Sequence, residues 1–267
     1  MTKAVFFDID GTLIDTANKR TKMTEPVFKA VAALKAAGHY TFIATGRPWA
    51  YLDKELTTSG LFDGFVLMNG AVVLLNGKVI YHKYLAKELV KKIVQFAEKN
   101  NLEYVLEGYP YVYLKPNYQA LEQVYTDIDI SLDNFVRDYD LAAINVSKME
   151  FLAQNPSEAG VLRKLLALEG VTGLIDPNLV KYMELYSADI SKGTGLLAAL
   201  KALNISINDS YALGDGLNDL EMMDIVGHSL VMGNAGSVLK TKAEHILPTV
   251  EHDGVAEGIH RYILKDC

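Results

Sequence analysis

The sequence predicts an α/β protein: a doubly wound parallel sheet forms a core, which an inserted α+β cap interrupts. Near both ends of the chain, short apolar runs alternate with helical segments, and this alternation is typical of a parallel sheet with helices on both faces. In the middle of the chain the order changes to hairpins and mixed strands and helices. No linker or low-complexity segment marks the joins. We therefore predict one core domain from residues 1–80 and 188–267, and an inserted domain from residues 81–187.

The first strand and helix have clear local signals. Residues 4–7 (AVFF) are wholly apolar, as in a strand that is buried on both faces. Thr24 can cap a helix over residues 25–37, and Pro26 suits its first turn. Gly38 can end this helix. The apolar residues on one face of the predicted helix are Val27, Ala30, Val31 and Leu34.

Two more strands are predicted before the insertion. They begin at Thr41 (TFIATG) and at Phe65 (FVLMNG), with a helix from Trp49 between them. A hairpin about Asn76-Gly77 follows, because this dipeptide favours a two-residue turn between strands.

The insertion is predicted to mix helices and strands, and the alternation returns after it. Helices are expected over residues 86–101, 117–125 and 156–168, and strands at EYVLEG (103–108), YVYL (111–114), LAAINVS (141–147), VTGLI (171–175) and VKYMELYS (180–187). From Lys192 onward we expect a helix, the strand SYALGD, a helix from Leu217, the strand and turn SLVMGNA, and a final helix after Asp253.

Composition narrows the function classes. The chain has 267 residues, of which 50% are hydrophobic, and a formal net charge of -7. An acidic chain without a Lys/Arg-rich run argues against nucleic acid as a partner, and no uncharged stretch approaches the length of a membrane span. With a single cysteine, Cys267, and an opening apolar run stopped by Asp8, we expect a cytoplasmic protein without a signal peptide. The oligomeric state cannot be predicted from the sequence.

Two aspartates, Asp8 and Asp10, stand at the carboxyl end of the first apolar run. Burying an unpaired carboxylate is costly, so a strand of this kind has no structural use for the pair. Beyond the carboxyl ends of parallel strands, in contrast, ligands bind and can compensate such charges. A solvated turn is the alternative interpretation, and it leaves both side chains without a purpose.

Three further polar segments follow predicted strands or open a predicted helix. They are ATGR with Thr45 and Gly46, SKGTG with Lys192, and GDGLND with Asp215, Asn218 and Asp219. Clustered carboxylates repel one another unless a hard divalent cation bridges them, and Mg²⁺ prefers oxygen ligands. One carboxylate can then attack a phosphoryl group, a second can transfer the proton, and hydroxyl, backbone and lysine donors can hold the phosphoryl oxygens. The segments together therefore favour phosphoryl transfer, although each alone could be a turn, a helix cap or a surface lysine.

In this order, FFDIDGT, ATGR, SKGTG and GDGLND resemble the four motifs of the haloacid dehalogenase (HAD) superfamily of phosphatases. The phrases MNGA (68–71), VMGNA (231–235) and DGVAEGI (253–259) extend the resemblance to Cof-type sugar phosphatases with a type IIB (C2) cap. The resemblance covers the core from both ends and implies a Rossmann-like HAD core. The predicted cap is similar to the family's cap in position and length, without a shared motif.

The resemblance implies a role for each matching residue. Asp8 would be the nucleophile and a Mg²⁺ ligand, Asp10 the general acid and base with its backbone carbonyl on the metal, and Asp215 the third protein ligand. Binding of the phosphoryl group would fall to the backbone of Ile9 and to Thr45, Gly46, Lys192 and Asn218. Asp219 would orient Lys192 or a metal-bound water, and Asn234 would line the site.

We therefore expect a magnesium-dependent phosphatase of small phosphorylated metabolites, above all sugar phosphates, with an aspartyl-phosphate on Asp8. Only 36 residues separate Asp8 from Thr45, whereas 146 separate Thr45 from Lys192, so the second interval holds the cap, as in the C2 arrangement. Two alternatives stay open: a phosphomannomutase-like phosphomutase, and a non-enzymatic regulatory protein that keeps the fold. Asp10 argues against the regulatory protein, because a binding module has no need of an acid and base.

Overall fold

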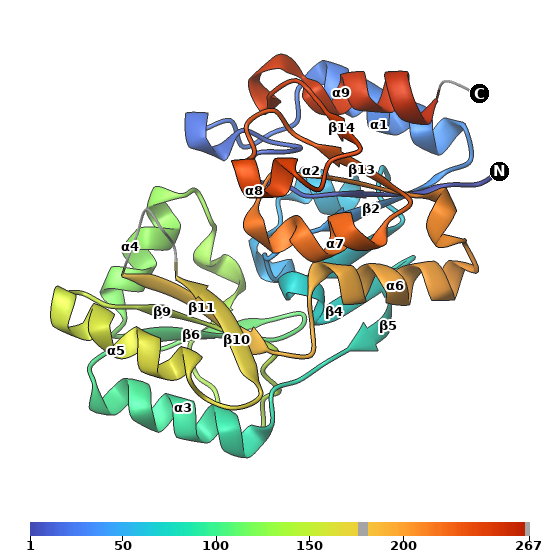
Figure 1. Cartoon of the computed structure of the whole chain (residues 1–267). Helices are drawn as coiled ribbons and strands as arrows, with labels where there is room; N and C mark the ends of the chain where they lie inside the picture. Colours follow the sequence, from blue (N-terminus) through green and yellow to red (C-terminus); the bar gives the residue numbers. More distant parts are fainter. Residues whose placement is uncertain (176–180, 265–267) are drawn as a thin grey trace. The chain divides into compact units, whose positions relative to one another are not determined.

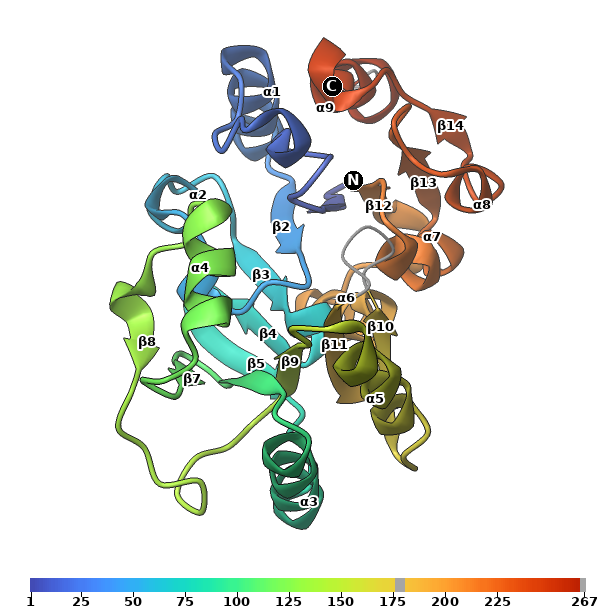
Figure 2. The same ribbon diagram turned by 90° about the vertical axis from the view of Figure 1, so that its left-hand side faces the viewer.

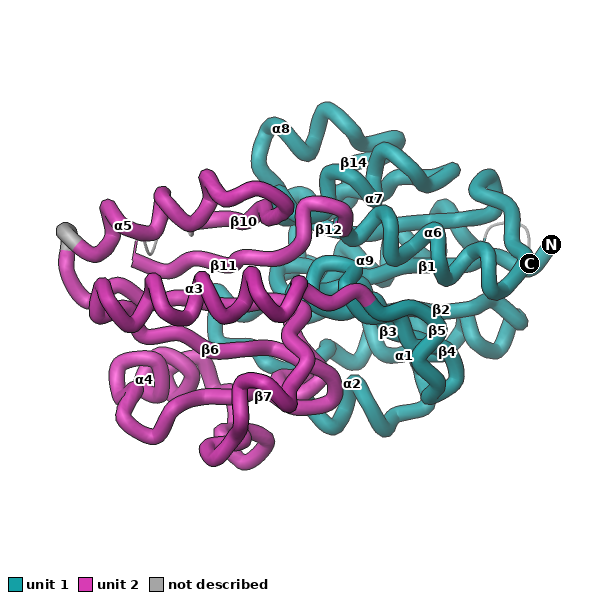
Figure 3. Tube along the Cα trace, turned by 90° about the horizontal axis from the view of Figure 1, so that it is seen from below, with its two compact units in different colours: residues 1–46, 53–82, 191–267 teal, residues 47–52, 83–190 magenta. Residues whose placement is uncertain are grey.

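The computed structural model describes residues 1–175 and 181–264, which form two compact units (Figure 3). Of the described residues, unit 1 comprises 1–46, 53–82 and 191–264, and unit 2 comprises 47–52, 83–175 and 181–190. The domain boundaries predicted from the sequence, with 81–187 as the insertion, stay a prediction. No helix in the described part of the chain is long and apolar enough to span a bilayer.

Unit 1 is built on an eight-stranded sheet in the order β14-β13-β12-β1-β2-β3-β4-β5 (Figure 2). The strands are β1 (Ala4–Phe7), β2 (Tyr40–Ala44), β3 (Gly64–Leu67), β4 (Val72–Leu75), β5 (Lys78–His82), β12 (Ser210–Gly214), β13 (His228–Val231) and β14 (His245–Ile246). Neighbours from β14 to β3 pair in parallel, and β3, β4 and β5 pair antiparallel. The predicted α/β class is confirmed, and the predicted hairpin is the β4–β5 pair.

Helices cover both faces of this sheet. They are α1 (Glu25–Ala36), α2 (Lys54–Thr58), α6 (Lys192–Leu203), α7 (Leu220–Ile225), α8 (Ser237–Lys240) and α9 (Gly254–Gly258). Figure 1 shows α6 and α7 on one face and α1 and α9 on the other. Helix α1 begins as predicted, because the Thr24 side chain accepts a hydrogen bond from the Val27 N–H, and the four predicted apolar residues are its buried residues.

The helix predicted from Trp49 is interrupted in the structure. One 3-10 turn spans Trp49–Tyr51, the chain is extended at Leu52, and α2 begins at Lys54. The physical reason is a new cap at Asp53, whose side chain accepts a hydrogen bond from the Glu55 N–H at 2.6 Å. The short turn belongs to unit 2, where the Tyr51 ring stacks on Phe135 at 5.5 Å between ring centroids.

Unit 2 contains a six-stranded sheet in the order β10-β11-β9-β6-β7-β8. Its strands are β6 (Glu103–Glu107), β7 (Val112–Leu114), β8 (Phe135–Val136), β9 (Lys148–Leu152), β10 (Val171–Ile175) and β11 (Tyr182–Ser187), and its helices are α3 (Lys87–Lys99), α4 (Gln119–Asp127) and α5 (Pro156–Leu166). Within this unit, α3 and α5 cover one face of the sheet and α4 lies on the other (Figure 1).

The strand predicted at LAAINVS is wrong, because residues 141–143 form a turn, residues 144–147 are irregular, and β9 begins only at Lys148. Asp140 starts this turn, since its carboxylate accepts a hydrogen bond from the Ala142 N–H at 2.9 Å and its carbonyl accepts one from the Ala143 N–H at 3.0 Å. The true strand carries Lys148 and Glu150, and its sequence (KMEFL) therefore lacks the apolar signal of a buried strand. Tertiary pairing of these charges is what allows the strand to be buried.

The charges of β9 belong to a buried cluster on the α4 face of unit 2. Lys148 Nζ lies 2.9 Å from Glu150, 3.2 Å from Glu184 and 3.4 Å from Glu107. Glu150 also accepts a hydrogen bond from the Tyr125 hydroxyl at 2.7 Å. Burial, and then the charge of Glu150, raise the pKa of Glu107 well above its usual value. Burial acts in the same direction on Glu150, but Lys148 and hydrogen bonds outweigh it and lower the pKa of Glu150 to about 2.

The raised pKa of Glu107 predicts a pH-dependent stability. Between the usual glutamate pKa and the raised one, folded Glu107 keeps a proton that the unfolded chain loses. Its contribution is therefore full at low pH and falls as pH rises, by at most about 1.4 kcal/mol per pH unit. We expect Glu107→Gln to gain stability relative to the wild type from pH 5 to pH 8, in urea unfolding experiments. Glu88→Gln, at an exposed position of α3, is the control. A wild-type-to-variant difference that does not change with pH would contradict the prediction.

Candidate active site

Asp8 directly follows β1, a central strand of the unit 1 sheet that pairs with β2 and β12. Its backbone N–H continues the ladder by donating to the Leu213 carbonyl at 2.9 Å. Three residues later the chain turns at Gly11, where φ is 81°. A Cβ atom at Gly11 would lie 2.2 Å from Asp215 Oδ2, so only glycine allows this loop to pass so close to the carboxylate.

Lys192 joins two of the predicted carboxylates. Its Nζ lies 2.6 Å from Asp8 Oδ1 and 2.6 Å from Asp219 Oδ1, and its side chain is fully buried. A cation is unfavourable at a helix N-terminus, where Lys192 begins α6, so the two carboxylates compensate this position. Burial alone would lower the pKa of Lys192, but Asp219 and Asp8 raise it above the usual lysine value. Lys192 is therefore a fixed positive charge in the site.

Asp219 also organises the loop that holds Asp215. Its Oδ2 accepts hydrogen bonds from the backbone N–H groups of Asp215, at 3.0 Å, and Gly216, at 2.9 Å. One carboxylate therefore fixes both the lysine and the loop. This arrangement agrees with the predicted role of Asp219 in orienting Lys192, and the role itself stays a prediction.

Asp215 is held by two polar side chains. Thr12 donates its hydroxyl to Asp215 Oδ1 at 2.8 Å, and Asn234 donates its amide to Oδ2 at 3.1 Å. Asn234 also donates to the Gly11 carbonyl at 2.8 Å and accepts from the Val250 N–H at 2.9 Å. Burial raises the pKa of Asp215 to about 6, against the opposing hydrogen bond from Thr12. Asn234 thus contacts Asp215 and the loop at Gly11, and its role in lining the site stays a prediction.

The carboxylates of Asp8, Asp215 and Asp219 offer oxygen atoms within 4.8 Å of one another. Burial, the largest cause, raises the pKa of Asp8 well above its usual value, and Asp219, Asp215 and Asp10 add to the effect. Three carboxylates and one lysine leave an excess of negative charge that a hard divalent cation would neutralise. The donor set therefore fits Mg²⁺. Asp10 is only partly buried, and its charge acts on both Asp8 and Asp215.

The predicted phosphate-binding residues follow β1 (Ile9), β2 (Thr45 and Gly46) and β12 (Asn218), or begin α6 (Lys192). Thr45 is buried, and its N–H donates to the Val66 carbonyl at 2.8 Å. A Cβ atom at Gly46 would lie 3.1 Å from Asn69 Oδ1 and 3.6 Å from Asn218 Nδ2. Ile9 is fully buried in the loop after Asp8, and its carbonyl accepts from the Thr12 N–H at 3.2 Å. The five predicted residues all lie in unit 1, and their roles in binding phosphate stay predictions.

Two polar residues at this site have no predicted role. Thr12 holds Asp215, and Asn69 accepts a hydrogen bond from Asn218 at 3.1 Å. The sequence marks both positions as candidates for the site, because Thr12 stands in FFDIDGT and Asn69 follows an apolar strand in MNGA. What the sequence does not contain is their partners, since Thr12 and Asp215 are 203 residues apart.

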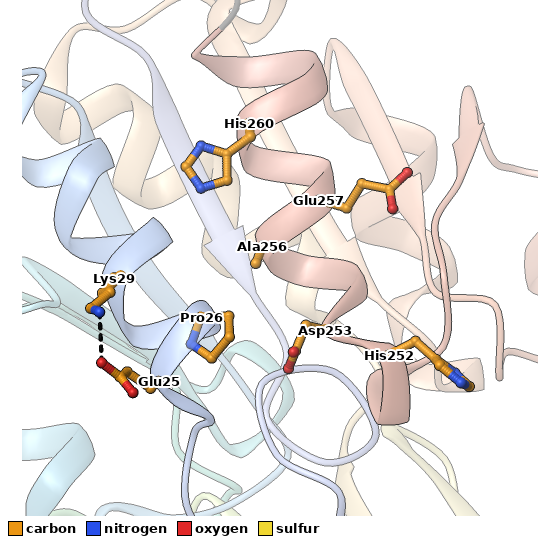
Figure 4. Close-up of a pocket in the computed structure, with 8 residues that line it drawn as sticks. All are labelled: Glu25, Pro26, Lys29, His252, Asp253, Ala256, Glu257 and His260. Carbon is orange, nitrogen blue, oxygen red and sulfur yellow. Dashed lines mark ion pairs between the residues drawn. The ribbon is translucent and has the colours of Figure 1, made fainter.

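A surface pocket of about 490 Å³ in unit 1 lies apart from these residues. It is formed between α1 and the C-terminal helical segment, and its lining residues are Glu25, Pro26, Lys29, His252, Asp253, Ala256, Glu257 and His260. Figure 4 shows these side chains spread along the two elements, with an ion pair between Lys29 and Glu25 at 2.6 Å. They do not converge on one point, and none of them is a predicted site residue. We therefore place the candidate active site at the carboxylate cluster.

Most of this chain resembles known proteins. The family model of the haloacid dehalogenase-like hydrolases matches residues 5–259. The Bacillus subtilis (strain 168) protein named "Putative phosphatase YkrA" is 28% identical over 273 residues, which cover 97% of this chain and 96% of that protein. Phosphatase YwpJ of the same strain is 24% identical over 289 residues, which cover 95% and 97%. The solved structure of the HAD subclass IIB sugar phosphatase BT4131 has a TM-score of 0.84 at 24% identity, over 98% of this chain and 99% of that one.

Proposed function

The chain belongs to the haloacid dehalogenase-like hydrolases, and from this premise we propose that it hydrolyses small phosphorylated metabolites, sugar phosphates first among them, with Mg²⁺ as cofactor. The enzyme class is a phosphatase. The finer proposal is supported above all by one observation: Lys192 bridges Asp8 and Asp219, beside Asp215. Such a cluster combines a nucleophile, a fixed cation and an excess of negative charge, which are the parts that phosphoryl transfer needs.

In the proposed reaction, Asp8 attacks the phosphorus atom of the substrate. A bond forms between a carboxylate oxygen and phosphorus while the ester P–O bond breaks, and Asp10 gives its proton to the leaving oxygen. Lys192 donates to Oδ1 of Asp8, so we assign the attack to Oδ2. In the second half, Asp10 takes a proton from a water molecule, whose oxygen attacks phosphorus and breaks the bond to Asp8. The products are the alcohol and inorganic phosphate, and Asp8 and Asp10 return to their initial states.

The remaining residues bind and orient the phosphoryl group. We propose that Thr45, the Gly46 and Ile9 backbone, Asn218 and Lys192 donate hydrogen bonds to its oxygens, where negative charge develops. When bound by Asp8, Asp215 and the Asp10 backbone carbonyl, Mg²⁺ would supply positive charge that offsets the repulsion between carboxylates and phosphate. Thr12 and Asn234 keep Asp215 in one orientation through their hydrogen bonds.

A phosphate-release screen with and without Mg²⁺ tests this function. The panel contains hexose, pentose and glycerol phosphates, nucleotides, pyridoxal phosphate and p-nitrophenyl phosphate. We expect release from sugar phosphates that EDTA abolishes and that added Mg²⁺ restores, because the carboxylate cluster repels the phosphate dianion without the cation. Undiminished release after EDTA treatment would contradict the metal dependence. No phosphate release from any compound, together with isomerisation of a sugar phosphate that depends on a bisphosphorylated activator, would favour the phosphomutase alternative.

A further inference from the structure

The turn that follows β3 has an unusual backbone. Met68, Asn69 and Gly70 all have positive φ, of 50°, 54° and 98°. Glycine adopts this region freely and asparagine tolerates it, but a methionine there is rare and strained. Strained conformations persist only where the surrounding structure determines them, and they cluster at functional sites. The contacts of this turn with neighbouring segments explain why its strained backbone persists.

Asn69 contacts two of the segments predicted to bind phosphate. Its backbone N–H donates to the Thr45 carbonyl at 3.1 Å, and its Oδ1 accepts from Asn218 Nδ2 at 3.1 Å. Its side chain also lies against Gly46, since a Cβ atom there would be 3.1 Å from Asn69 Oδ1. Asn69 is 1% exposed, so these contacts replace contacts with water. One residue thus joins the end of β2 to the segment after β12.

The next residue of the turn contacts the third segment. A Cβ atom at Gly70 would lie 2.0 Å from the Ser191 carbonyl oxygen. Ser191 is the N-cap of α6, the helix that begins at Lys192. The turn therefore packs between the Thr45–Gly46 loop, Asn218 and the start of the helix that carries the lysine. With its left-handed backbone, the turn makes the contacts of Asn69 and of Gly70 at once.

We propose that Asn69 is a positioning residue for phosphoryl transfer, an inference that rests on the proposed function. Its carboxamide oxygen holds the amide of Asn218 in one orientation, and its backbone N–H holds the Thr45 carbonyl. The donors of Thr45, Gly46 and Asn218 are thereby directed at the same phosphoryl group. Asparagine suits the position, because it combines tolerance of the left-handed region with a hydrogen-bond acceptor.

Two substitutions separate the side chain from the backbone. Asn69→Gly removes the carboxamide and keeps a residue that adopts positive φ without strain, whereas Asn69→Ala removes the carboxamide and is strained there. For both variants we expect kcat/KM to fall and the inhibition constant of inorganic phosphate to rise, each by about five-fold, the value of one uncharged hydrogen bond. Both variants lose a buried hydrogen bond, and the alanine variant should show the lower thermal midpoint of the two, because of its added strain. Normal activity and phosphate affinity in Asn69→Gly would overturn the proposal and leave only a backbone role.

Asn76→Gly is the matched control. Asn76 is also an asparagine with positive φ, of 49°, and it lies in the exposed hairpin turn between β4 and β5. Its replacement should leave kcat/KM and phosphate inhibition unchanged. A loss equal to that of Asn69→Gly would mean that flexible glycine in any such turn impairs the enzyme, and the proposal would fail.

A double variant tests whether Asn69 acts through Asn218. If it does, Asn69→Gly should reduce kcat/KM no further once Asn218→Ala is present. Full additivity of the two losses would overturn this route. Binding of inorganic phosphate to each variant, measured by calorimetry, needs no turnover. It therefore tests the positioning role of Asn69 separately from the proposed hydrolysis. If the wild type binds phosphate but hydrolyses no substrate, the proposed function is contradicted. The positioning role of Asn69 is then tested by the phosphate affinities of the variants alone. A wild type that does not bind phosphate overturns both.

Discussion

Asp8→Asn is expected to abolish phosphate release while the protein stays folded. A carboxamide has nearly the same shape as a carboxylate but is not a nucleophile toward phosphorus. The substitution also removes a charge that burial disfavours and that neighbouring carboxylates repel, which together outweigh the attraction of Lys192. Lys192 keeps Asp219 as a partner. We therefore expect turnover below detection, with a thermal midpoint that is unchanged or higher. Initial rates and thermal unfolding curves, measured on the same preparations, check both expectations.

The control for this variant is Asp224→Asn, which changes an exposed aspartate of unit 1. Asp224 pairs with Lys242 at 2.9 Å on the surface, and such surface pairs contribute little to stability. Its turnover should equal that of the wild type. A direct readout is the label that stays on the protein when its reaction with a substrate labelled in the phosphoryl group is quenched with acid. Only a chain with Asp8 can retain this label as an acyl phosphate at that position. Near-normal turnover of Asp8→Asn would exclude the covalent mechanism.

Lys192→Met has the second largest expected effect. Lys192 is the partner of both Asp8 and Asp219 at 2.6 Å, and the substitution leaves two buried carboxylates without their cation. Breaking a buried pair in this way costs about 3–5 kcal/mol of stability. Loss of a fixed charge that stabilises the transition state lowers kcat about a hundred-fold or more. Urea unfolding and steady-state rates measure the two effects.

Cations and protons should partly replace the lost lysine. Without Mg²⁺, the stability lost in Lys192→Met should be larger at pH 8 than at pH 5, because protonation relieves the repulsion between unpaired carboxylates. Added Mg²⁺ should recover part of this stability. Lys201→Met, at an exposed position of the last turn of α6, is the control for the loss of a lysine from this helix. A stability loss independent of pH and Mg²⁺ would show that Lys192 matters only for packing.

Local sequence patterns were sufficient to predict much of the fold and the residue types at the candidate site. Strand β1 has the predicted bounds, because a short apolar run that ends at a carboxylate favours a strand buried on both faces. Helix α1 begins after Thr24, since a cap and a helical apolar period act within a few residues. The positions of Asp8, Thr45 and Asp215 at strand ends follow from the same reasoning, because strand ends in a parallel sheet meet at one edge.

Only the tertiary structure decided which distant polar groups pair. The strand KMEFL is buried because Lys148 meets three glutamates, of which two stand on other strands, and a charge cluster has no sequence period. In the same way the Asn69–Asn218 bond joins residues 149 positions apart. The sequence by itself determined that this chain carries the carboxylates, lysine and strand ends of the proposed phosphoryl-transfer site. The tertiary structure decided which residues orient them, because hydrogen bonds between distant segments depend on the folded geometry and not on local spacing.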